Sequence, residues 1–352
     1  MEANPKEGKI VSGSASINSK AGKVRIVQSS KNAVIHWKDF SIQKGEITEF
    51  SVSHQKGATL NRVISKKLSE IAGCLRSNGK IYLINPNGIL VTPTGVVNTA
   101  GVVFSTLNIS DDDFLFDRYL SFSGESDARV VNLGKISTAA GDVVFVGQVI
   151  ENQGTIDAPE GGVYLAAGKE VLILPEGERR IQIKVPVSES ISGNSIDHSG
   201  MIEAAHVEIE ASGGNPYALA VKSSGAVHVK GFTKREGQIF LTANDQNIEV
   251  SGILTAEKEN GSGGDIHILG NRVQVTSGAQ IVASSVAKEG NGGSIYILGN
   301  AWASLESDIY AQGGVKKGNG GFVEFSAPIL ECLASAYTNA RDGVSPSGKF
   351  LL

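Results

Sequence analysis

A short segment past the middle of the chain offers the residue types that bind cations or acidic sugars. His206, Glu208 and Glu210 alternate there with Val207 and Ile209. Successive side chains of a strand point to opposite faces, so the three polar groups share one face. On such a face they could bind a cation or a sugar, as in a polysaccharide lyase. Alternation alone produces such rows, so we interpret this one as a solvated strand face.

The run Asp111-Asp112-Asp113 is a second candidate for metal binding. Calcium loops space Asp, Asn and Gly at alternate positions, and this run lacks that pattern. It is more typical of a turn or of the start of a helix. The sequence also lacks Gly-x-Ser-x-Gly, Gly-Lys-Ser/Thr and His-Glu-x-x-His motifs. We therefore predict no catalytic residue, no metal ligand, no cofactor and no enzymatic activity.

A constrained turn is the most informative local feature of the chain. Lys80–Ile84 is an apolar run typical of a strand buried on both faces. Pro86 fixes its own φ and biases Asn85 toward extended backbone, while Asn87-Gly88 readily takes positive φ. The strand must therefore turn sharply before Ile89.

Internal repeats predict the fold that positions this turn. A Gly-Gly-led strand recurs at Gly264, Gly293 and Gly321, at intervals of 29 and 28 residues. A polar residue shortly before Gly, followed by a short apolar strand, recurs between these strands, for example at Asn152–Ile156. Units of this size suit one coil of a parallel β-helix, whereas a propeller blade needs roughly 40 to 50 residues. The predicted fold class is an all-β, right-handed parallel β-helix.

Equivalent residues of successive coils should stack about 4.8 Å apart along the core. The predicted inward columns are Ile136, Ile156, Ile202, Val227, Ile253 and Ile281, and Val143, Val163, Ile239, Ile266, Ile295 and Phe322.

Three segments are expected to depart from the regular coil. The apolar spacing of Ile64, Leu68, Ile71 and Leu75 predicts a short helix near residues 65–76. Two alternating strands around a polar turn predict a hairpin outside the β-helix near residues 170–186. An N-terminal cap must cover the unpaired first coil. The predicted cap strands are Lys23–Val27, Ala33–Trp37 and Ile47–Phe50.

Composition limits the classes of partner and compartment. A net charge of −4 gives no basic footprint, so nucleic acid is not the expected partner. Cys74 and Cys332 lie 258 positions apart, and each is expected to be a small buried apolar residue. No apolar run approaches the roughly 20 residues that cross a bilayer. The first residues lack the order of a signal peptide, so the chain is either cytosolic or has lost a leader.

Several blocks of the first half resemble the filamentous-haemagglutinin-type N-terminal domain of two-partner secretion exoproteins. The blocks occur in the family's order, and the match is strong over residues 10 to 215. They are Ala33-Val34-Ile35-His36-Trp37-Lys38-Asp39-Phe40, Leu60-Asn61-Arg62-Val63, Ser77-Asn78-Gly79-Lys80-Ile81-Tyr82-Leu83-Ile84-Asn85-Pro86-Asn87-Gly88-Ile89-Leu90 and Ser105-Thr106-Leu107-Asn108-Ile109-Ser110-Asp111-Asp112-Asp113-Phe114.

The resemblance implies a domain that leads an exoprotein through an outer-membrane transporter with polypeptide-transport-associated domains. It implies a leader that is cleaved, recognition of the chain before it folds, and a secreted or cell-surface protein. The family's secretion motif falls on Asn85, Pro86, Asn87, Gly88 and Ile89, and other matching positions are Asn61, Arg62, Asn78 and Gly79. The motif either orients the first coils or contacts the transporter. A second family motif, Asn-Pro-Asn-Leu, is absent, which fits the adhesin and haem-acquisition branch.

The resulting prediction is a two-partner secretion domain in residues 1–215, followed by further coils of one continuous β-helix in residues 216–352. Gly343–Leu352 resembles a coil cut short, so we expect a longer effector region beyond it. We expect a monomer with an adhesin or haemagglutinin-like role that binds a host surface receptor or glycan. The alternatives are a secreted carbohydrate-active β-helix and the stalk of a contact-dependent toxin.

Overall fold

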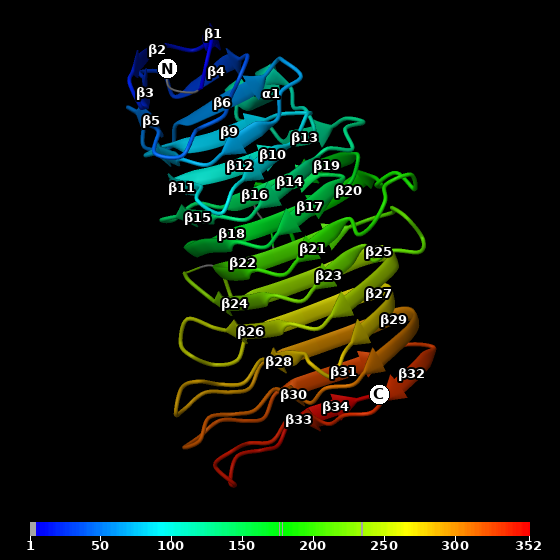
Figure 1. The fold of residues 1–352 in the computed structure, drawn as a ribbon. Helices are drawn as coiled ribbons and strands as arrows, with labels where there is room; N and C mark the ends of the chain where they lie inside the picture. The colour runs from blue at the N-terminus through cyan, green and yellow to red at the C-terminus, as the bar shows by residue number, and fades with distance from the viewer. Residues whose placement is uncertain (1–4, 176, 178, 234) are drawn as a thin grey trace. The chain divides into compact units, whose positions relative to one another are not determined.

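Parallel ladders of short strands build the computed structural model, which describes residues 5–352 except 176, 178 and 234. The chain divides into two compact units, residues 1–191 (unit 1) and residues 192–352 (unit 2). In each unit, short strands stack on the equivalent strands of the next coil (Figure 1). Each unit is a right-handed parallel β-helix, which confirms the predicted fold class.

Three parallel ladders form the walls of unit 1, and their strands are given in order along each wall. The first wall contains β3 (Lys23–Gln28), β5 (Ile47–Val52), β8 (Cys74–Ser77), β11 (Val96–Thr99), β15 (Lys135–Thr138) and the start of β18 (Thr155–Ala167). The second contains β4 (Asn32–Trp37), β6 (Ala58–Val63), β9 (Lys80–Ile84), β12 (Gly101–Ser105), β16 (Val143–Gly147) and the end of β18. The third contains β7 (Ser69–Ile71), β10 (Ile89–Val91), β14 (Arg129–Asn132) and β17 (Val149–Asn152).

The core of unit 1 follows from one-to-one register between coils. Phe104 of β12 lies on Phe145 of β16, with stacked rings 5.7 Å apart. Both side chains are fully buried, as is the neighbouring Val143. Side chains alternate across a strand, so repeating the same apolar position in each coil produces a continuous inward column.

The N-terminal cap is formed by earlier residues than predicted. β1 (Lys9–Ser12) and β2 (Ala15–Lys20) pair antiparallel with β4 and β3. The strands predicted to be the cap, β3, β4 and β5, instead belong to the parallel ladders. Gly22, with φ of +72°, allows the tight turn that folds β2 back onto β3.

Residues 65–76 do not form the predicted helix. They contain β7 and β8, because Ile71 and Leu75 are buried inside the coil, whereas Ile64 and Leu68 are exposed. A corner at Gly73 separates the two strands, and a Cβ there would lie 2.3 Å from the carbonyl of Gln43. The helical spacing thus arose from two short strands on either side of a corner.

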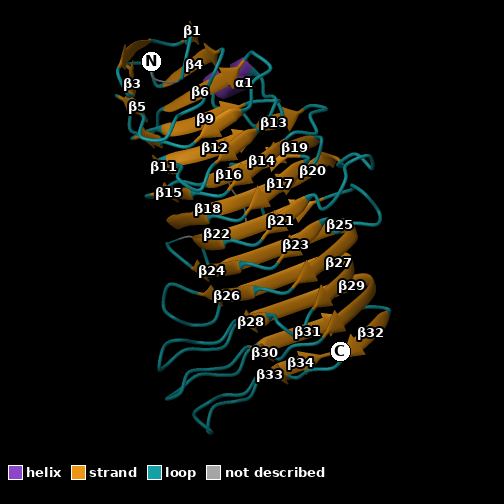
Figure 2. Cartoon of the chain, in the orientation of Figure 1, coloured by secondary structure: helices purple, strands orange, loops and turns teal. Residues whose placement is uncertain are grey.

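The one helix of the described residues is α1 (Asp111–Leu115), drawn in purple beside β4 and β6 in Figure 2. Ser110 caps it by accepting a hydrogen bond from Asp113 N. Asp111, Asp112 and Asp113 occupy its first turn, where carboxylates are stabilised by the helix dipole. This confirms that the acidic run starts a helix.

A separate antiparallel sheet contains the predicted hairpin. β19 (Glu170–Ile173) pairs with β20 (Ile181–Val185), and β13 (Leu120–Ser123), which the sequence did not indicate, pairs with β19. Phe122, Val171 and Ile181 of this sheet pack in one cluster with outward residues of the second wall. That wall is therefore buried on both faces, as predicted for Lys80–Ile84.

Unit 2 repeats the same plan with longer strands. One wall contains β21 (Ile196–His198), β23 (Val221–Ser223), the ends of β25 (Gln238–Val250), β27 (Asp265–Val275) and β29 (Ser294–Leu305), and β32 (Ile329–Cys332). The next contains the end of β22 (Met201–Ala211), the starts of β25, β27 and β29, β31 (Phe322–Ser326) and β34 (Lys349–Leu351). The last contains the start of β22, β24 (Ala226–Lys230), β26 (Ile253–Glu257), β28 (Gln280–Val282), β30 (Ile309–Tyr310) and β33 (Ala336–Tyr337).

The predicted inward columns are confirmed except at two positions. Leu254 takes the place predicted for Ile253, and Val323 takes the place predicted for Phe322. In both coils the buried residue is the second after the corner glycine. Stacking of corner glycines sets this count: a Cβ at Gly252 would lie 2.0 Å from the carbonyl of Gly225.

Candidate functional site

The predicted turn lies between β9 and β10. Gly88 has φ of +106°, and its N–H donates to the carbonyl of Asn85 at 3.0 Å. A Cβ at Gly88 would also lie 2.9 Å from Cδ1 of Leu68. Glycine is therefore favoured here by its positive φ, while the tip of the exposed Leu68 side chain could move aside, and the prediction of a sharp turn is confirmed.

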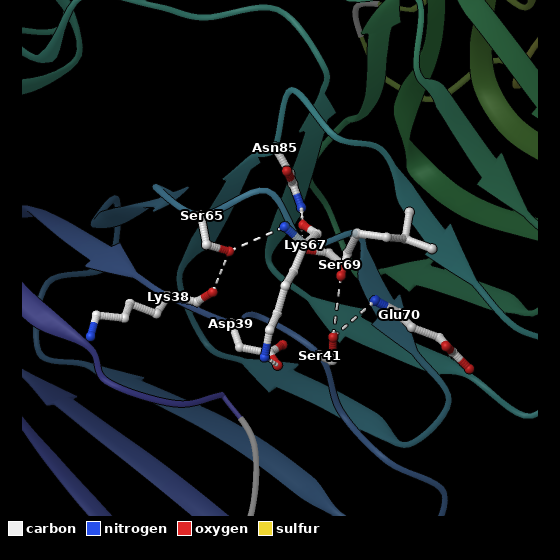
Figure 3. A network of polar contacts seen from close by, with 9 residues as sticks. Lys38, Asp39, Ser41, Ser65, Lys67, Ser69, Glu70 and Asn85 are labelled. Atoms are coloured by element: carbon white, nitrogen blue, oxygen red, sulfur yellow. Dashed lines mark hydrogen bonds and ion pairs between the residues drawn. The ribbon is translucent and has the colours of Figure 1, made fainter.

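Both asparagines of the turn hold the preceding coil. The buried Asn85 donates through Nδ2 to the carbonyl of Lys67 and to Oγ of Ser69, each at 2.9 Å (Figure 3). Its Oδ1 accepts from Asn87 N at 2.9 Å, and Asn87 Nδ2 donates to the carbonyl of Ser65 at 2.8 Å. The turn thus satisfies backbone carbonyls of segment 65–69, in which only Ser69 belongs to a strand.

Segment 65–69 is in turn held by the coil before it. Ser65 Oγ donates to the carbonyl of Lys38 at 2.6 Å and accepts from Lys67 N at 3.1 Å. Ser41 Oγ donates to the carbonyl of Leu68 at 3.4 Å and accepts from Glu70 N at 3.3 Å. Figure 3 shows these side chains linking one backbone segment to the next.

The same pattern continues toward later coils of unit 1. Ser126 Oγ donates to the carbonyl of Pro86 at 2.6 Å, and Gln148 Nε2 donates to the carbonyl of Ser126 at 2.9 Å. Polar side chains therefore connect the successive turns at one corner of unit 1, which we call the corner ladder. Its members are Ser41, Ser65, Ser69, Asn85, Asn87, Ser126 and Gln148.

Little of the turn reaches solvent. Asn85, Gly88 and Ile89 are buried, Asn87 is half-buried and Pro86 is exposed. In the folded chain, the asparagines are thus engaged inside the corner ladder rather than displayed on the surface.

Asn61 and Arg62 occupy adjacent positions of β6 and point to opposite faces. Asn61 is buried, accepts from Trp37 Nε1 at 2.9 Å and donates to the carbonyl of Tyr82 at 3.2 Å. It therefore satisfies the one buried indole beneath the cap. Arg62 points outward and forms an ion pair with Asp111.

The Arg62 guanidinium also donates to Oδ1 of Asn108 at 3.1 Å and to the carbonyl of Ile109 at 2.8 Å. It thereby fixes the loop before α1 onto β6. His36 is its neighbour in the preceding coil. Burial, followed by the positive charge of Arg62, lowers the pKa of His36.

Asn78 and Gly79 lie in another corner, beside Val52 of the preceding coil. Asn78 bonds the backbone of Val52 twice, accepting from its N–H at 2.7 Å and donating to its carbonyl at 2.8 Å. A Cβ at Gly79 would lie 2.8 Å from Cγ2 of Val52. These two residues therefore hold the corner after β8 against Val52, the last residue of β5 in the preceding coil.

The candidate ligand face of unit 2 is not solvated, so that interpretation is wrong. His206, Glu208 and Glu210 are only 4%, 0% and 4% exposed. All three lie in β22, which pairs with β25 of the next coil. There Phe240 is opposite Glu208, with its ring 5.7 Å from that of His206. Their burial leaves the two carboxylates inaccessible to a polysaccharide chain.

Other candidates for chemistry are also accounted for. Cys74 is half-buried and Cys332 is exposed, so neither is the buried apolar residue that we predicted. Cys332 is the last residue of β32, a strand whose residues are all exposed or half-buried. Among the described residues, no cluster of His, Cys, Asp or Glu is placed to hold a metal ion.

Sequence reasoning missed most of the corner ladder. Ser41, Ser65, Ser126 and Gln148 are common polar residues in segments without a marked pattern. Their shared signal is a polar residue one to four positions before a short strand or bridge, as in Ser41-Ile42 and Gln148-Val149. The signal identifies these residues only once the register between successive coils is known, because that register decides which polar side chains meet.

Comparisons with known proteins identify the domain. The family model described as the TPS secretion domain, the two-partner secretion domain, matches residues 1–256. The chain belongs to this family. The crystal structure of the HMW1 secretion domain from Haemophilus influenzae superimposes with a TM-score of 0.75 at 26% identity, covering 98% of this chain and 99% of that one.

Two curated relatives are Haemophilus influenzae proteins named heme/hemopexin-binding protein. One is 27% identical over 267 residues, which is 72% of this chain, and the other 28% identical over 273 residues, which is 70% of this chain. The match spans only 29% of each relative.

Membership of the family assigns the chain a role in two-partner secretion across the outer membrane, with an outer-membrane transporter as partner. The family is a non-catalytic secretion domain. Within the described residues, no helix has the length and apolar character to span a membrane.

Proposed function

We propose that the turn Asn85-Pro86-Asn87-Gly88-Ile89 is the signal that commits this exoprotein to its partner transporter. We assign the secretion role to residues 1–215. The supporting observation is the position of Asn85, whose buried amide joins two coil turns through bonds of 2.9 Å. Removing that amide would release segment 65–69 and the turn together, since each supplies the other's hydrogen-bond partners.

We further propose a surface role for the exoprotein that this domain leads. The curated relatives are more than three times as long as the matched region, so the recognition of a host receptor or glycan would lie largely outside it. An adhesin-like role is the primary candidate, with the protein acting as a monomer. Capture of haem or of a haem carrier is the second candidate, favoured by the names of both relatives.

A secreted carbohydrate-active enzyme is a weaker candidate. Hydrolysis or elimination on a polysaccharide needs carboxylates that reach the substrate. Glu208 and Glu210 were the residues suggested for that role, and both are buried. The chain offers no other grouping that the sequence marked for such chemistry.

An export assay with a matched asparagine control tests the signal. Asn85→Ala and Asn132→Ala would be compared in cells that contain the partner transporter. Both asparagines are buried and bond a neighbouring turn or coil, Asn132 through Asn152 Oδ1 at 2.8 Å and Gly134 N at 3.1 Å. The two substitutions therefore cost similar stability, of the order of 2 kcal/mol.

We expect Asn85→Ala to accumulate in the periplasm while Asn132→Ala reaches the medium or the cell surface. Export of Asn85→Ala at the wild-type level would refute the signal role. Equal loss of export in both variants would show that export depends on general stability rather than on this turn.

A further inference from the structure

The second wall of unit 1 carries an apolar column on the side that faces away from the core. Leu60 lies on the same face of β6 as the outward Arg62, and strand register stacks one such residue from each coil. None of these residues is more than 9% exposed except the half-buried Tyr82. The column therefore needs a cover from outside the coils. Its members are Val34, Leu60, Tyr82, Val103, Val144 and Tyr164.

The corresponding outward column of unit 2 differs in composition. It contains Glu208, Phe240, His267, Tyr296 and Glu324. Its last three members are half-buried. Coils of this fold thus form without a continuous apolar column on their outward side, so the column of unit 1 indicates a dedicated cover.

The cover comes from two separate parts of the chain. The first part, α1 and β13, lies between β12 and β14, and Phe114 of α1 packs edge-on against Tyr82 with ring centroids 5.1 Å apart. The second part, β19 and β20, follows β18, the last strand of the wall in unit 1. Phe122 of β13, Val171 of β19 and Ile181 of β20 are buried in the same cluster as the column.

The later part of the cover holds the earlier part. β19 is the central strand of the three-stranded sheet and pairs with both β13 and β20 (Figure 1). Gly124, which follows β13, donates its N–H to the carbonyl of Lys169 at 3.1 Å, and Glu125 forms an ion pair with Lys169 at 2.5 Å. The register of β13 on the wall is thus set by residues that come later in the chain.

Arg180 joins this sheet to the last strands of the wall. Its Nη1 lies 2.6 Å from Oδ2 of Asp142, and its guanidinium lies over the ring of Tyr164, 4.7 Å from the centroid. The side chains of the ion pair are only 14% and 20% exposed. Asp142 directly precedes β16 and Tyr164 belongs to β18, so the contact needs both strands in place.

The segment held by Lys169 also reaches the Asn85 turn. Ser126, the residue after Glu125, donates to the carbonyl of Pro86, and Gln148 donates to the carbonyl of Ser126. The outer bond of the turn therefore depends on a segment that β19 positions.

We propose that β13, β19 and β20 form a closing strap, which completes unit 1 only after its wall strands through β18 have stacked. Before the strap closes, the outward column lies in water and the Asn85 turn lacks its bond from Ser126. Contacts between distant parts of a chain form late, because the loop between them must first be closed. This inference concerns the order of folding and holds whether or not the turn is the export signal.

Amide hydrogen exchange of the purified full chain, read by mass spectrometry, tests the strap. The test variant is Val171→Ser with Ile181→Ser, and the control is Val273→Ser with Ile309→Ser. Each pair joins one valine and one isoleucine that are at most 4% exposed, and the control pair lies in unit 2.

We expect the test variant to lose protection about a hundredfold in β12, in β16 and in the turn at residues 85–89, because the column loses its cover. β27 of unit 2 should keep its protection. The control should show the reverse pattern. Unchanged exchange of β12 and β16 in the test variant, or an equal loss there in both variants, would overturn the inference.

Arg180→Gln is a milder variant that leaves the apolar cluster intact. It should lower the protection of β16 about tenfold while fluorescence of the buried Trp37 shows that unit 1 remains folded. Wild-type protection of β16 would show that Arg180 does not hold the strap, and would count against the inference.

Pulse labelling of amides during refolding from urea tests the order directly. β12 and β16 should become protected together with β19. Protection of β12 and β16 well before β19 would show folding coil by coil and overturn the strap. Export of Asn85→Ala at the wild-type level would instead refute the signal role and leave the strap standing.

Discussion

Successive coils meet at two kinds of corner that are built by different means. In unit 1, the corner ladder joins turns through side-chain amides and hydroxyls, each with its own backbone partner. At the other kind of corner, which both units contain, corner glycines lie directly on one another. In unit 1, a Cβ at Gly154 would lie 2.2 Å from the carbonyl oxygen of Gly134, and the same stacking recurs through unit 2. A Cβ at Gly264, Gly293, Gly321 or Gly348 would approach the carbonyl oxygen of the preceding corner glycine to 2.1, 1.8, 2.1 or 1.7 Å.

This difference has a consequence for specificity. The glycine corner gives every coil the same neighbour, so its contacts do not depend on which coil lies below. The corner ladder is different, because Asn85 fits only the carbonyl of Lys67 and the hydroxyl of Ser69. Polar side chains thus specify one arrangement at the corner ladder, while glycine allows close, uniform stacking at the glycine corners.

The largest expected effect is in the glycine corner. Gly293→Ala places a methyl group 1.8 Å from a backbone oxygen, and only a backbone shift can relieve that contact. We expect a loss of about 3 kcal/mol in the free energy of unfolding of unit 2. Trp302 is the one tryptophan of unit 2, so urea unfolding followed by its fluorescence in a Trp37→Phe background measures this effect.

Gly278→Ala is the matched control, because its added methyl group would lie no closer than 3.6 Å to Ser251 O. It should change stability by less than about 1 kcal/mol. If both variants had the same free energy of unfolding, the close approach at Gly293 would be relaxed in solution.

A smaller effect is expected in the corner ladder. Asn85→Ala leaves the carbonyl of Lys67 and the backbone N–H of Asn87 without their side-chain partner inside the corner. We expect a loss of about 2 kcal/mol in the unfolding of unit 1, and about 1 kcal/mol for the half-buried Asn87→Ala. Trp37 fluorescence in a Trp302→Phe background reports this transition. A matching loss in the Trp302 signal would contradict the view that the two corners are independent.

The sequence was sufficient to predict the β-helix because corner glycines and alternating apolar residues recur along it. It was also sufficient to predict the Asn85 turn, since Pro86 and Gly88 restrict the backbone locally. It misled at Ile64 and Leu68, where apolar residues at helical spacing are in fact exposed beside a corner. The partners of Asn85 lie 16 to 18 residues away, and their identity follows from coil register, which local patterns do not encode.

The smallest expected effect is a pH dependence of the stability of unit 1, which comes from His36 on its outward face. His36 lies between Lys9 and Arg62 in adjacent strands, with Asp111 as the opposing charge on Arg62. Burial and then the charge of Arg62 lower the pKa of His36, so the folded state favours the neutral imidazole. The unfolded chain therefore binds the proton more readily, and stability present above about pH 6.5 is lost as pH falls through the folded-state pKa.

We expect the wild-type Trp37 transition to shift to lower urea between pH 7 and pH 5, and to shift less in His36→Gln. The window lies above the range in which Glu49 and Asp117 titrate, since the pKa of each is lowered by a bonded lysine. An identical shift in both proteins would assign the pH dependence to other groups. A larger shift in the Trp302 signal would place the acid-sensitive region in unit 2, and so reverse this part of the comparison between the two units.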